Sequence, residues 1–254
     1  MTVVTPQAVT FTIEEATIAE INQAFDAGIL TSEELVELYL ERIEAFDEQG
    51  VAINSIITLN PEALATAAAL DEERQISGAR STLHGIPILL KDNIDTFDLP
   101  TSAGSLILEN SIPPDDAFVV EQLRDAGAII LGKTNLDEFA RGVSGLSSLG
   151  GQTLNPYDLT RVPGGSSAGT AAAIASNFAT LGLGTETGVS IRNPAANTNL
   201  VGIAPTEGLV SRDGVVPISF TQDRVGPLAR TITDAAIALD PTFRTSKCNI
   251  KQSR

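Results

Sequence analysis

Two short apolar segments, each followed by a lysine, constrain the fold of this chain more than any other feature. They are IPILL at residues 86–90, before Lys91, and AIILG at residues 128–132, before Lys133. Continuously apolar strands that alternate with helical segments indicate a parallel sheet that is buried on both faces. We therefore expect an α/β fold with a mixed, largely parallel sheet covered by helices on both faces. Both lysines then lie at carboxyl ends of strands, where open α/β sheets place their ligands.

Capping signals and apolar periodicity predict the remaining elements. Thr12 and Glu15 have capping-box spacing and predict a helix to about Ala27, and Thr31 with Glu34 predicts a second helix that closes at Gly50. The second helix is expected to pack through the face that carries Leu35, Tyr39, Arg42 and Phe46. Further signals predict a strand at 53–60 and helices at 61–73, at 116–126 and from about 231 to 240.

Charge and cysteine content exclude several classes of protein. The formal net charge is -16, which argues against a basic face for nucleic acid or for an anionic membrane. The single cysteine, Cys248, excludes an intrachain disulfide and indicates a reducing compartment, and no apolar stretch is long enough to span a bilayer. We expect a cytoplasmic enzyme with no direct nucleic-acid or membrane partner.

The glycine–serine loop RVPGGSSAGTAAAIA, residues 161–175, is the strongest local candidate for a functional site. A flexible linker does not fit its place before a helix, and a P-loop needs a lysine that this loop lacks, although a helix N-terminus can still hold an anion. Residues 165–169 match the G-x-S-x-G nucleophile elbow, whose mechanism needs a histidine downstream. The only histidine, His84, lies upstream, which excludes that order and leaves His84 a structural role in a loop.

Another base is therefore needed if a serine of this loop takes part in chemistry. A lysine serves when burial keeps it neutral, and serine–lysine pairs are known variants of the catalytic triad. Lys91 and Lys133 are the two lysines before the C-terminal tail, and both follow apolar strands. Their spacing to the loop does not choose between them.

Four segments of the chain closely resemble the amidase signature family. The longest runs from Pro163 to Pro217 and contains PGGSSAGTAAAIASNFATLGLGTETGVSIRNPAANTNL. LHGIPILLKDNID resembles the lysine segment of that family, and DDAFVVEQLRDAGAIILGKTNLDEFA and RVGPLARTITDAAIALD match as well. The resemblance covers residues 12–240, so we expect residues 1–240 to form one amidase signature domain. It implies the mixed α/β amidase fold and hydrolysis of carboxylic amides.

The resemblance also implies a Ser–Ser–Lys catalytic unit. Carried over by motif, the nucleophile is Ser190 in ETGVSIR, the bridging serine is Ser166 after a cis Gly165–Ser166 peptide, and the base is Lys91, which leaves Lys133 a structural role. Lysine has a reference pKa of about 10.4, so Lys91 must be desolvated and poor in neighbouring carboxylates to be neutral at pH 7. No metal or organic cofactor is implied. The oxyanion would be met by the backbone N–H groups of Thr187, Gly188, Val189 and Ser190.

Several positions depart from the usual family pattern. Ala168 replaces a common glycine, Glu186 replaces a common aspartate, and ANTN at 196–199 replaces a small-apolar run. Val189 stands where glycine is usual, and a β-branched residue is strained there if the turn requires a positive φ. Arg192 matches the arginine after the nucleophile, and we expect it to be a structural ion-pair partner.

The C-terminal segment differs in composition from the rest of the chain. Residues 244–254 carry four of the 16 basic residues, no acidic residue and the only cysteine. We expect residues 241–254 to be an atypical, disordered or non-native tail, and the chain to be a truncated form of the family fold. Truncation leaves an open sheet edge with unpaired N–H and C=O groups, so we expect association as a homo-oligomer or with a partner subunit.

Three functions are compatible with the sequence. The leading one is an amidase that hydrolyses a small-molecule carboxylic amide through an acyl-enzyme. An alternative is the A subunit of a glutamyl- or aspartyl-tRNA amidotransferase, which shares the signature and whose partner can hold the tRNA. The third is a catalytically inactive fragment. Because the part of the pocket that selects the substrate is expected to be missing, the sequence does not specify which amide is cleaved.

Overall fold

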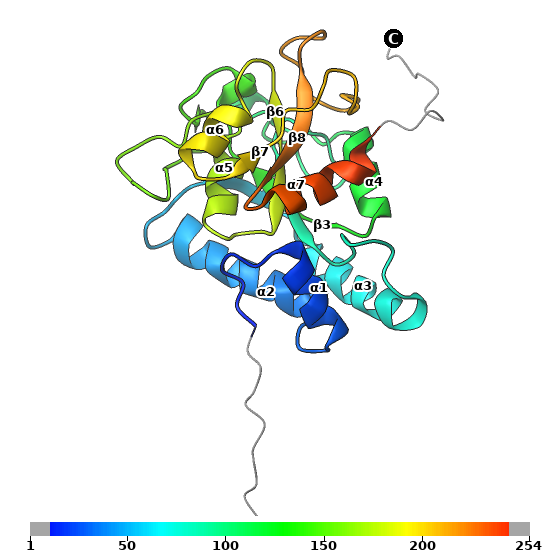
Figure 1. Ribbon diagram of the computed structural model, residues 1–254. Coiled ribbons are helices and arrows are strands. Elements are labelled where there is room, and N and C mark those ends of the chain that lie inside the picture. The colour runs from blue at the N-terminus through cyan, green and yellow to red at the C-terminus, as the bar shows by residue number, and fades with distance from the viewer. Residues whose placement is uncertain (1–10, 244–254) are drawn as a thin grey trace, which may run out of the picture.

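The computed structural model describes residues 11–243, and its main feature is one six-stranded sheet (Figure 1). The strand order across the sheet is β1-β3-β2-β6-β8-β7. The bounds are β1 (Ile56–Leu59), β2 (Pro87–Lys91), β3 (Ile129–Thr134), β6 (Leu181–Glu186), β7 (Val201–Gly202) and β8 (Arg224–Ala229). A separate two-stranded sheet contains β4 (Leu146–Ser147) and β5 (Gly151–Gln152).

The sheet is mixed, as the sequence predicts, with its parallel pairs at the centre. β2 pairs in parallel with both β3 and β6, whereas β1, β7 and β8 are antiparallel to their neighbours. In the central register Lys91 lies opposite Thr134, and Leu90 lies opposite Leu183. The carboxyl ends of β2, β3 and β6 therefore meet at one edge of the sheet, where Lys91 lies.

Helices cover both faces of this sheet. In Figure 1 the first three helices group together below the strands, and α5, α6 and α7 lie in the upper part of the molecule. The bounds are α1 (Ile18–Asp26), α2 (Ser32–Ile43), α3 (Ala63–Ser77), α4 (Phe118–Asp125), α5 (Ala168–Ala175), α6 (Arg192–Asn197) and α7 (Ile232–Leu239). A π-helical turn, η1 (Glu44–Glu48), extends α2, and short 3-10 turns form η2 (Leu106–Leu108), η3 (Glu138–Ala140) and η4 (Asp240–Thr242).

One predicted helix start is wrong and another is confirmed. The capping box at Thr31 and Glu34 forms as expected at the start of α2. The box expected at Thr12 does not form, because the one that opens α1 is Thr17 with Glu20. Both pairs have the same spacing, but Glu15 has a φ of 59° and its N–H donates to Asn177 Oδ1 at 2.8 Å. This contact with Asn177 holds Glu15 in a non-helical conformation, so the helix begins after it, at Ile18.

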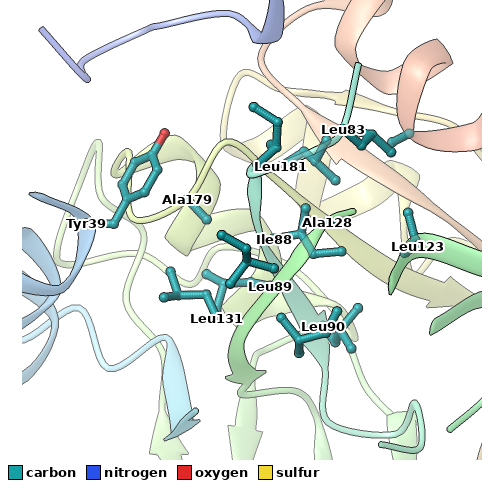
Figure 2. Close-up of a cluster of buried hydrophobic side chains, with 14 of the residues drawn as sticks. Tyr39, Leu83, Ile88, Leu89, Leu90, Leu123, Ala128, Leu131, Ala179 and Leu181 are labelled. Atoms are coloured by element: carbon teal, nitrogen blue, oxygen red, sulfur yellow. The ribbon is translucent and has the colours of Figure 1, made fainter. Parts of the chain in front are cut away.

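The core is built around β2, all five residues of which are buried. Figure 2 shows Ile88, Leu89 and Leu90 of this strand among the side chains of neighbouring elements, including Leu131 of β3. On α2 the predicted packing face is confirmed at Leu35 and Tyr39, which are fully buried, whereas Phe46 lies in η1 and is 43% exposed. Lys91, at the end of this strand, is therefore fully buried at the edge of the apolar core.

The C-terminal prediction falls mostly outside the described residues. Residues 241–243 belong to the folded body, because η4 contacts α4 and Phe243 forms a β-bridge with Val210. The rest of the predicted tail, residues 244–254 with Cys248, lies beyond the described part. Among residues 11–243 every helix is too short, or too polar, to cross a bilayer.

Candidate active site

Lys91 is a fully buried lysine at the carboxyl end of β2. Its Nζ donates hydrogen bonds to Ser166 Oγ at 2.7 Å, to Thr185 Oγ1 at 2.9 Å and to the Thr185 carbonyl at 3.2 Å. Burial disfavours the charged form and lowers the pKa of Lys91 to about 7. At neutral pH a large share of this amine is therefore unprotonated and able to accept a proton.

The expectation of few carboxylates around Lys91 is wrong. Asp137, Asp223 and Glu186 all act on its charge and raise the pKa of Lys91 against the larger effect of burial. Without these three negative charges, burial would favour the neutral form still more. The carboxylates thus keep the lysine close to the midpoint of its titration at neutral pH.

Ser166 lies at the other end of the hydrogen bond from Lys91. The Gly165–Ser166 peptide is cis, which confirms the expectation from the family resemblance. Ser166 is fully buried, and its carbonyl accepts a hydrogen bond from the Asp137 N–H at 3.2 Å. A Cβ on Gly165 would overlap the Asp137 carboxylate, so a larger residue before Ser166 would displace that side chain. α5 begins two residues later, at Ala168.

Ser190 lies in the turn between β6 and α6. Its side chain is almost fully buried, and its carbonyl accepts a hydrogen bond from the Ser167 N–H at 3.1 Å. This backbone bond brings the turn of Ser190 against the loop of Ser166. Among the hydrogen bonds of residues 11–243 there is none between the hydroxyls of Ser166 and Ser190.

The backbone of the turn Thr187–Ser190 has unused donors, and we call it the oxyanion turn after the role that the resemblance implies for it. In the described part of the chain, the N–H groups of its four residues donate to no protein acceptor. The Val189 residue of this turn is not among those with a positive φ, so the strain considered for a β-branched residue does not arise. Val189 is 48% exposed, so its side chain points to solvent rather than into the fold.

Glu186 fixes the end of β6 to the start of α6. Its carboxylate accepts hydrogen bonds from the N–H groups of Ile191 and Arg192 and from Arg192 Nε, at 2.8 to 3.0 Å. Burial alone raises the pKa of Glu186, but the bonds from Arg192 and Ile191 hold it below its usual value. The ion-pair role expected for Arg192 is confirmed, because its Nη2 lies 2.7 Å from Glu186 Oε1.

Lys133 and His84 have other surroundings. Lys133 is fully buried and paired with Asp92 at 3.3 Å, and its Nζ also donates to Thr101 Oγ1 at 2.9 Å. Burial lowers the pKa of Lys133, and the Asp92 carboxylate opposes that effect. His84 is fully buried in contact with the Leu70 carbonyl, with Nε2 at 2.8 Å from the oxygen. Neither residue has a hydrogen bond to Ser166 or Ser190 within the described chain.

Besides the Asp137 carboxylate, sequence reasoning missed three polar groups of the site. Thr185 accepts from Lys91 and also from Asn93 Nδ2 at 3.1 Å. Asp223 accepts from the Thr187 hydroxyl and from the N–H groups of Ile218 and Ser219. Thr185 and Asn93 carried a signal, since both lie at the ends of strands beside the predicted base. Asp223 carried none, because it is 33 residues beyond Ser190 in the sequence.

The described residues hold no group of three His, Cys, Asp or Glu side chains arranged for a metal ion. Two open surface hollows of about 360 and 370 Å³ share Phe11, Thr12 and Glu14 in their linings. Neither hollow includes a residue of the Lys91, Ser166 and Ser190 group.

The mixed α/β sheet, the buried Lys91 and the cis peptide before Ser166 are what the resemblance to the amidase signature family implies. The Amidase family profile matches residues 34–254, and the chain belongs to this family. The structure of a peptide amidase from Stenotrophomonas maltophilia superposes with a TM-score of 0.89 and 50% identity, over 92% of this chain and 49% of that one.

Two sequence relatives are named for different functions. A probable amidase of Arabidopsis thaliana is 47% identical over 91% of this chain and 46% of its own length. The A subunit of the glutamyl-tRNA(Gln) amidotransferase of Alkaliphilus metalliredigens is 47% identical over 92% of this chain and 48% of its own length. The chain thus spans about half the length of the curated relatives it matches.

Proposed function

We propose that this chain carries the catalytic group of an amidase that hydrolyses carboxylic amides, with Ser190 as nucleophile, Ser166 as proton relay and Lys91 as base. One observation supports this most strongly. The buried Lys91, with a pKa of about 7, has its Nζ 2.7 Å from Ser166 Oγ. A neutral amine beside a serine hydroxyl is the arrangement that serine–lysine catalysis needs.

The first half of the reaction forms an acyl-enzyme. Neutral Lys91 accepts the proton of Ser166, and Ser166 accepts the proton of Ser190 as Ser190 Oγ bonds to the amide carbon. The link between the two serine hydroxyls forms with substrate in place, since catalytic hydrogen bonds often tighten only in the complex. The proton then returns through Ser166 to the leaving nitrogen, the C–N bond breaks, and the amine departs.

The second half of the reaction releases the acid. Water attacks the ester of Ser190, and its proton passes to Lys91 by the same relay before returning to Ser190 Oγ. In both halves the negative carbonyl oxygen is held by the N–H groups of the oxyanion turn, Thr187–Ser190. Donors that are already oriented toward the developing charge lower the barrier, and removal of one such donor costs on the order of 100-fold or more in rate. No step uses a metal or an organic cofactor.

Lys133 supports the site without taking part in the relay. Asp92 directly follows Lys91 in the sequence. Its carboxylate is held by the ion pair with Lys133 and by a hydrogen bond from the hydroxyl of Ser102. The Asp92 carboxylate at 3.3 Å favours the charged form of Lys133 against the lowering of its pKa by burial, and it occupies the amine with an ion pair in place of a serine hydroxyl.

A second candidate is the A subunit of a tRNA-dependent amidotransferase. It is favoured by the 47% identity to the corresponding chain from Alkaliphilus metalliredigens. In that role the same Ser190 would release ammonia from glutamine, and a partner subunit would bind the tRNA, since the net charge of -16 opposes direct binding of a polyanion.

Product release from simple amides and from glutamine, with and without an added partner subunit, tests these proposals. Turnover of simple amides by the chain alone supports the amidase, and glutamine turnover that requires the partner supports the amidotransferase. In either case we expect Ser190→Ala and Lys91→Ala to abolish turnover and Lys133→Ala to retain it. A folded chain that hydrolyses neither class would identify a catalytically inactive fragment and reject both proposals.

A further inference from the structure

A carboxylate far from the catalytic serines in sequence lies beside the oxyanion turn. Asp223, directly before β8, is only 8% exposed. Its Oδ1 accepts a hydrogen bond from the hydroxyl of Thr187, the first residue of the turn. Its Oδ2 accepts from the N–H groups of Ile218 and Ser219, at 2.8 and 2.9 Å. The carboxylate therefore joins the turn to the loop 216–223.

The loop 216–223 is itself fixed to the end of β2. The Val216 N–H donates to the Asn93 carbonyl at 2.9 Å, and Asn93 Nδ2 donates back to the Val216 carbonyl at 3.3 Å. Asn93 is two residues from Lys91 and also donates to Thr185 Oγ1. One continuous set of hydrogen bonds thus runs from the strand of the base, through the loop, to the oxyanion turn.

Three carbonyl groups of the oxyanion turn accept hydrogen bonds, whereas its N–H groups make none within the described chain. Its four N–H groups have no protein acceptor in residues 11–243, and a Cβ on Gly188 would meet nothing within 4 Å. Arg192 Nη2 donates to the Gly188 carbonyl at 2.6 Å, and the Val189 and Ser190 carbonyls accept from the N–H groups of Asn193 and Ser167. Within residues 11–243, the hydrogen bond from the Thr187 hydroxyl to Asp223 is the only one in which a side chain of the turn takes part.

We propose that Asp223 and the Thr187 hydroxyl are positioning residues, which hold the oxyanion turn at a fixed distance from the Lys91–Ser166 pair. This inference rests on the proposed function, because the position of the turn matters for the reaction only if Ser190 is the nucleophile. A charge-assisted hydrogen bond to a largely buried carboxylate is stronger than a neutral one and orders the group that donates it. The backbone N–H of Thr187 then keeps its direction when charge develops on the substrate oxygen.

The test measures the rate at which a fluorophosphonate labels Ser190 in the full chain, since this reaction uses the nucleophile and the oxyanion turn without needing turnover. Thr187→Val removes the hydroxyl and keeps the shape of the side chain. We expect labelling to slow by at least about 10-fold, and Thr187→Ser, which keeps the hydroxyl, to restore most of the rate. Thermal unfolding is followed in every variant.

Thr180→Val is the matched control. Thr180 directly precedes β6, at the opposite end from Thr187, and its buried hydroxyl bonds to the Tyr39 hydroxyl at 3.1 Å. This variant loses one buried side-chain hydrogen bond at the other end of the same strand, and its labelling rate should match that of the unmodified chain. Equal slowing in both variants would mean general loosening of β6 and would overturn the inference.

The pH dependence of labelling separates positioning from an effect on the base. Asp137, Asp223 and Glu186 are the carboxylates that act on Lys91, and Thr187→Val changes none of them. For Thr187→Val we expect the labelling rate to reach a lower plateau at high pH, and to rise over the same pH range as in the unmodified chain. A displaced limb, or an unchanged rate, would refute the role of the tether. A chain that fluorophosphonate labels elsewhere, or not at all, would instead refute the proposed function, and this inference with it.

Discussion

Replacing Lys91 by methionine should make the protein more stable while removing its activity. Burial lowers the pKa of Lys91 from 10.5 to about 7. Each pKa unit corresponds to about 1.4 kcal/mol, so holding the charged amine of Lys91 costs the folded state about 5 kcal/mol. The unfolded chain keeps its proton up to about pH 10.5, whereas the folded chain releases it near 7. The cost is therefore complete below pH 7 and disappears between pH 7 and 10.5.

The substitution also has an opposing effect. Methionine leaves Ser166 Oγ without the donor 2.7 Å away, and an unpaired buried polar group costs about 1–3 kcal/mol. Thr185 Oγ1 is less affected, because it still accepts from Asn93. We expect Lys91→Met to raise the free energy of unfolding by about 2–4 kcal/mol near pH 6.

Lys133→Met is the control, because Lys133 is equally buried but is paired. Its loss leaves the Asp92 carboxylate buried without its cation, which should cost about 3–5 kcal/mol. Urea unfolding at about pH 6, pH 8 and pH 10 gives both free energies and their dependence on pH. The reasoning is refuted if Lys91→Met destabilises the protein at the lowest of these pH values, or if its stabilising effect does not shrink as the pH rises.

Three further predictions concern the site. The rate of amide hydrolysis should rise with pH through about 7, because the neutral form of Lys91 is the base, and a pH-independent rate would contradict this. Gly165→Ala should abolish activity and lower the melting temperature, since its Cβ would overlap the Asp137 carboxylate, whereas Gly188→Ala, with nothing within 4 Å, should melt like the parent. Val189→Gly should lower the free energy of unfolding by up to about 1 kcal/mol, and a gain in a urea titration would reveal strain at Val189.

The elements that local sequence determines were predictable. β2 follows from a continuous apolar run, and the start of α2 follows from Thr31 and Glu34, because these side chains cap the helix through bonds three residues apart. The start of α1 was not predictable by the same rule. Thr12 and Thr17 have identical spacing to a glutamate, and the contact that decides between them is made with Asn177.

The candidate site divides in the same way. Lys91, Ser166 and Ser190 follow from motifs, and the strand ends at which Lys91 and Lys133 lie follow from apolar patterning. The choice between the two lysines needed the resemblance, and the structure adds the pairing of Lys133 with Asp92. The carboxylates of Asp137 and Asp223 were missed because their approach to Lys91 is set by the folding of distant loops, which no local pattern encodes.

The central claim is that Ser190 is the nucleophile and that Lys91 activates it through Ser166. Its most direct test is mass-spectrometric mapping of the residue that a fluorophosphonate modifies, in the unmodified chain and in Lys91→Ala. We predict a single modified peptide that contains Ser190, and no modification after the lysine is replaced. Modification of Ser166 or Ser167, or full labelling in Lys91→Ala, would contradict the account.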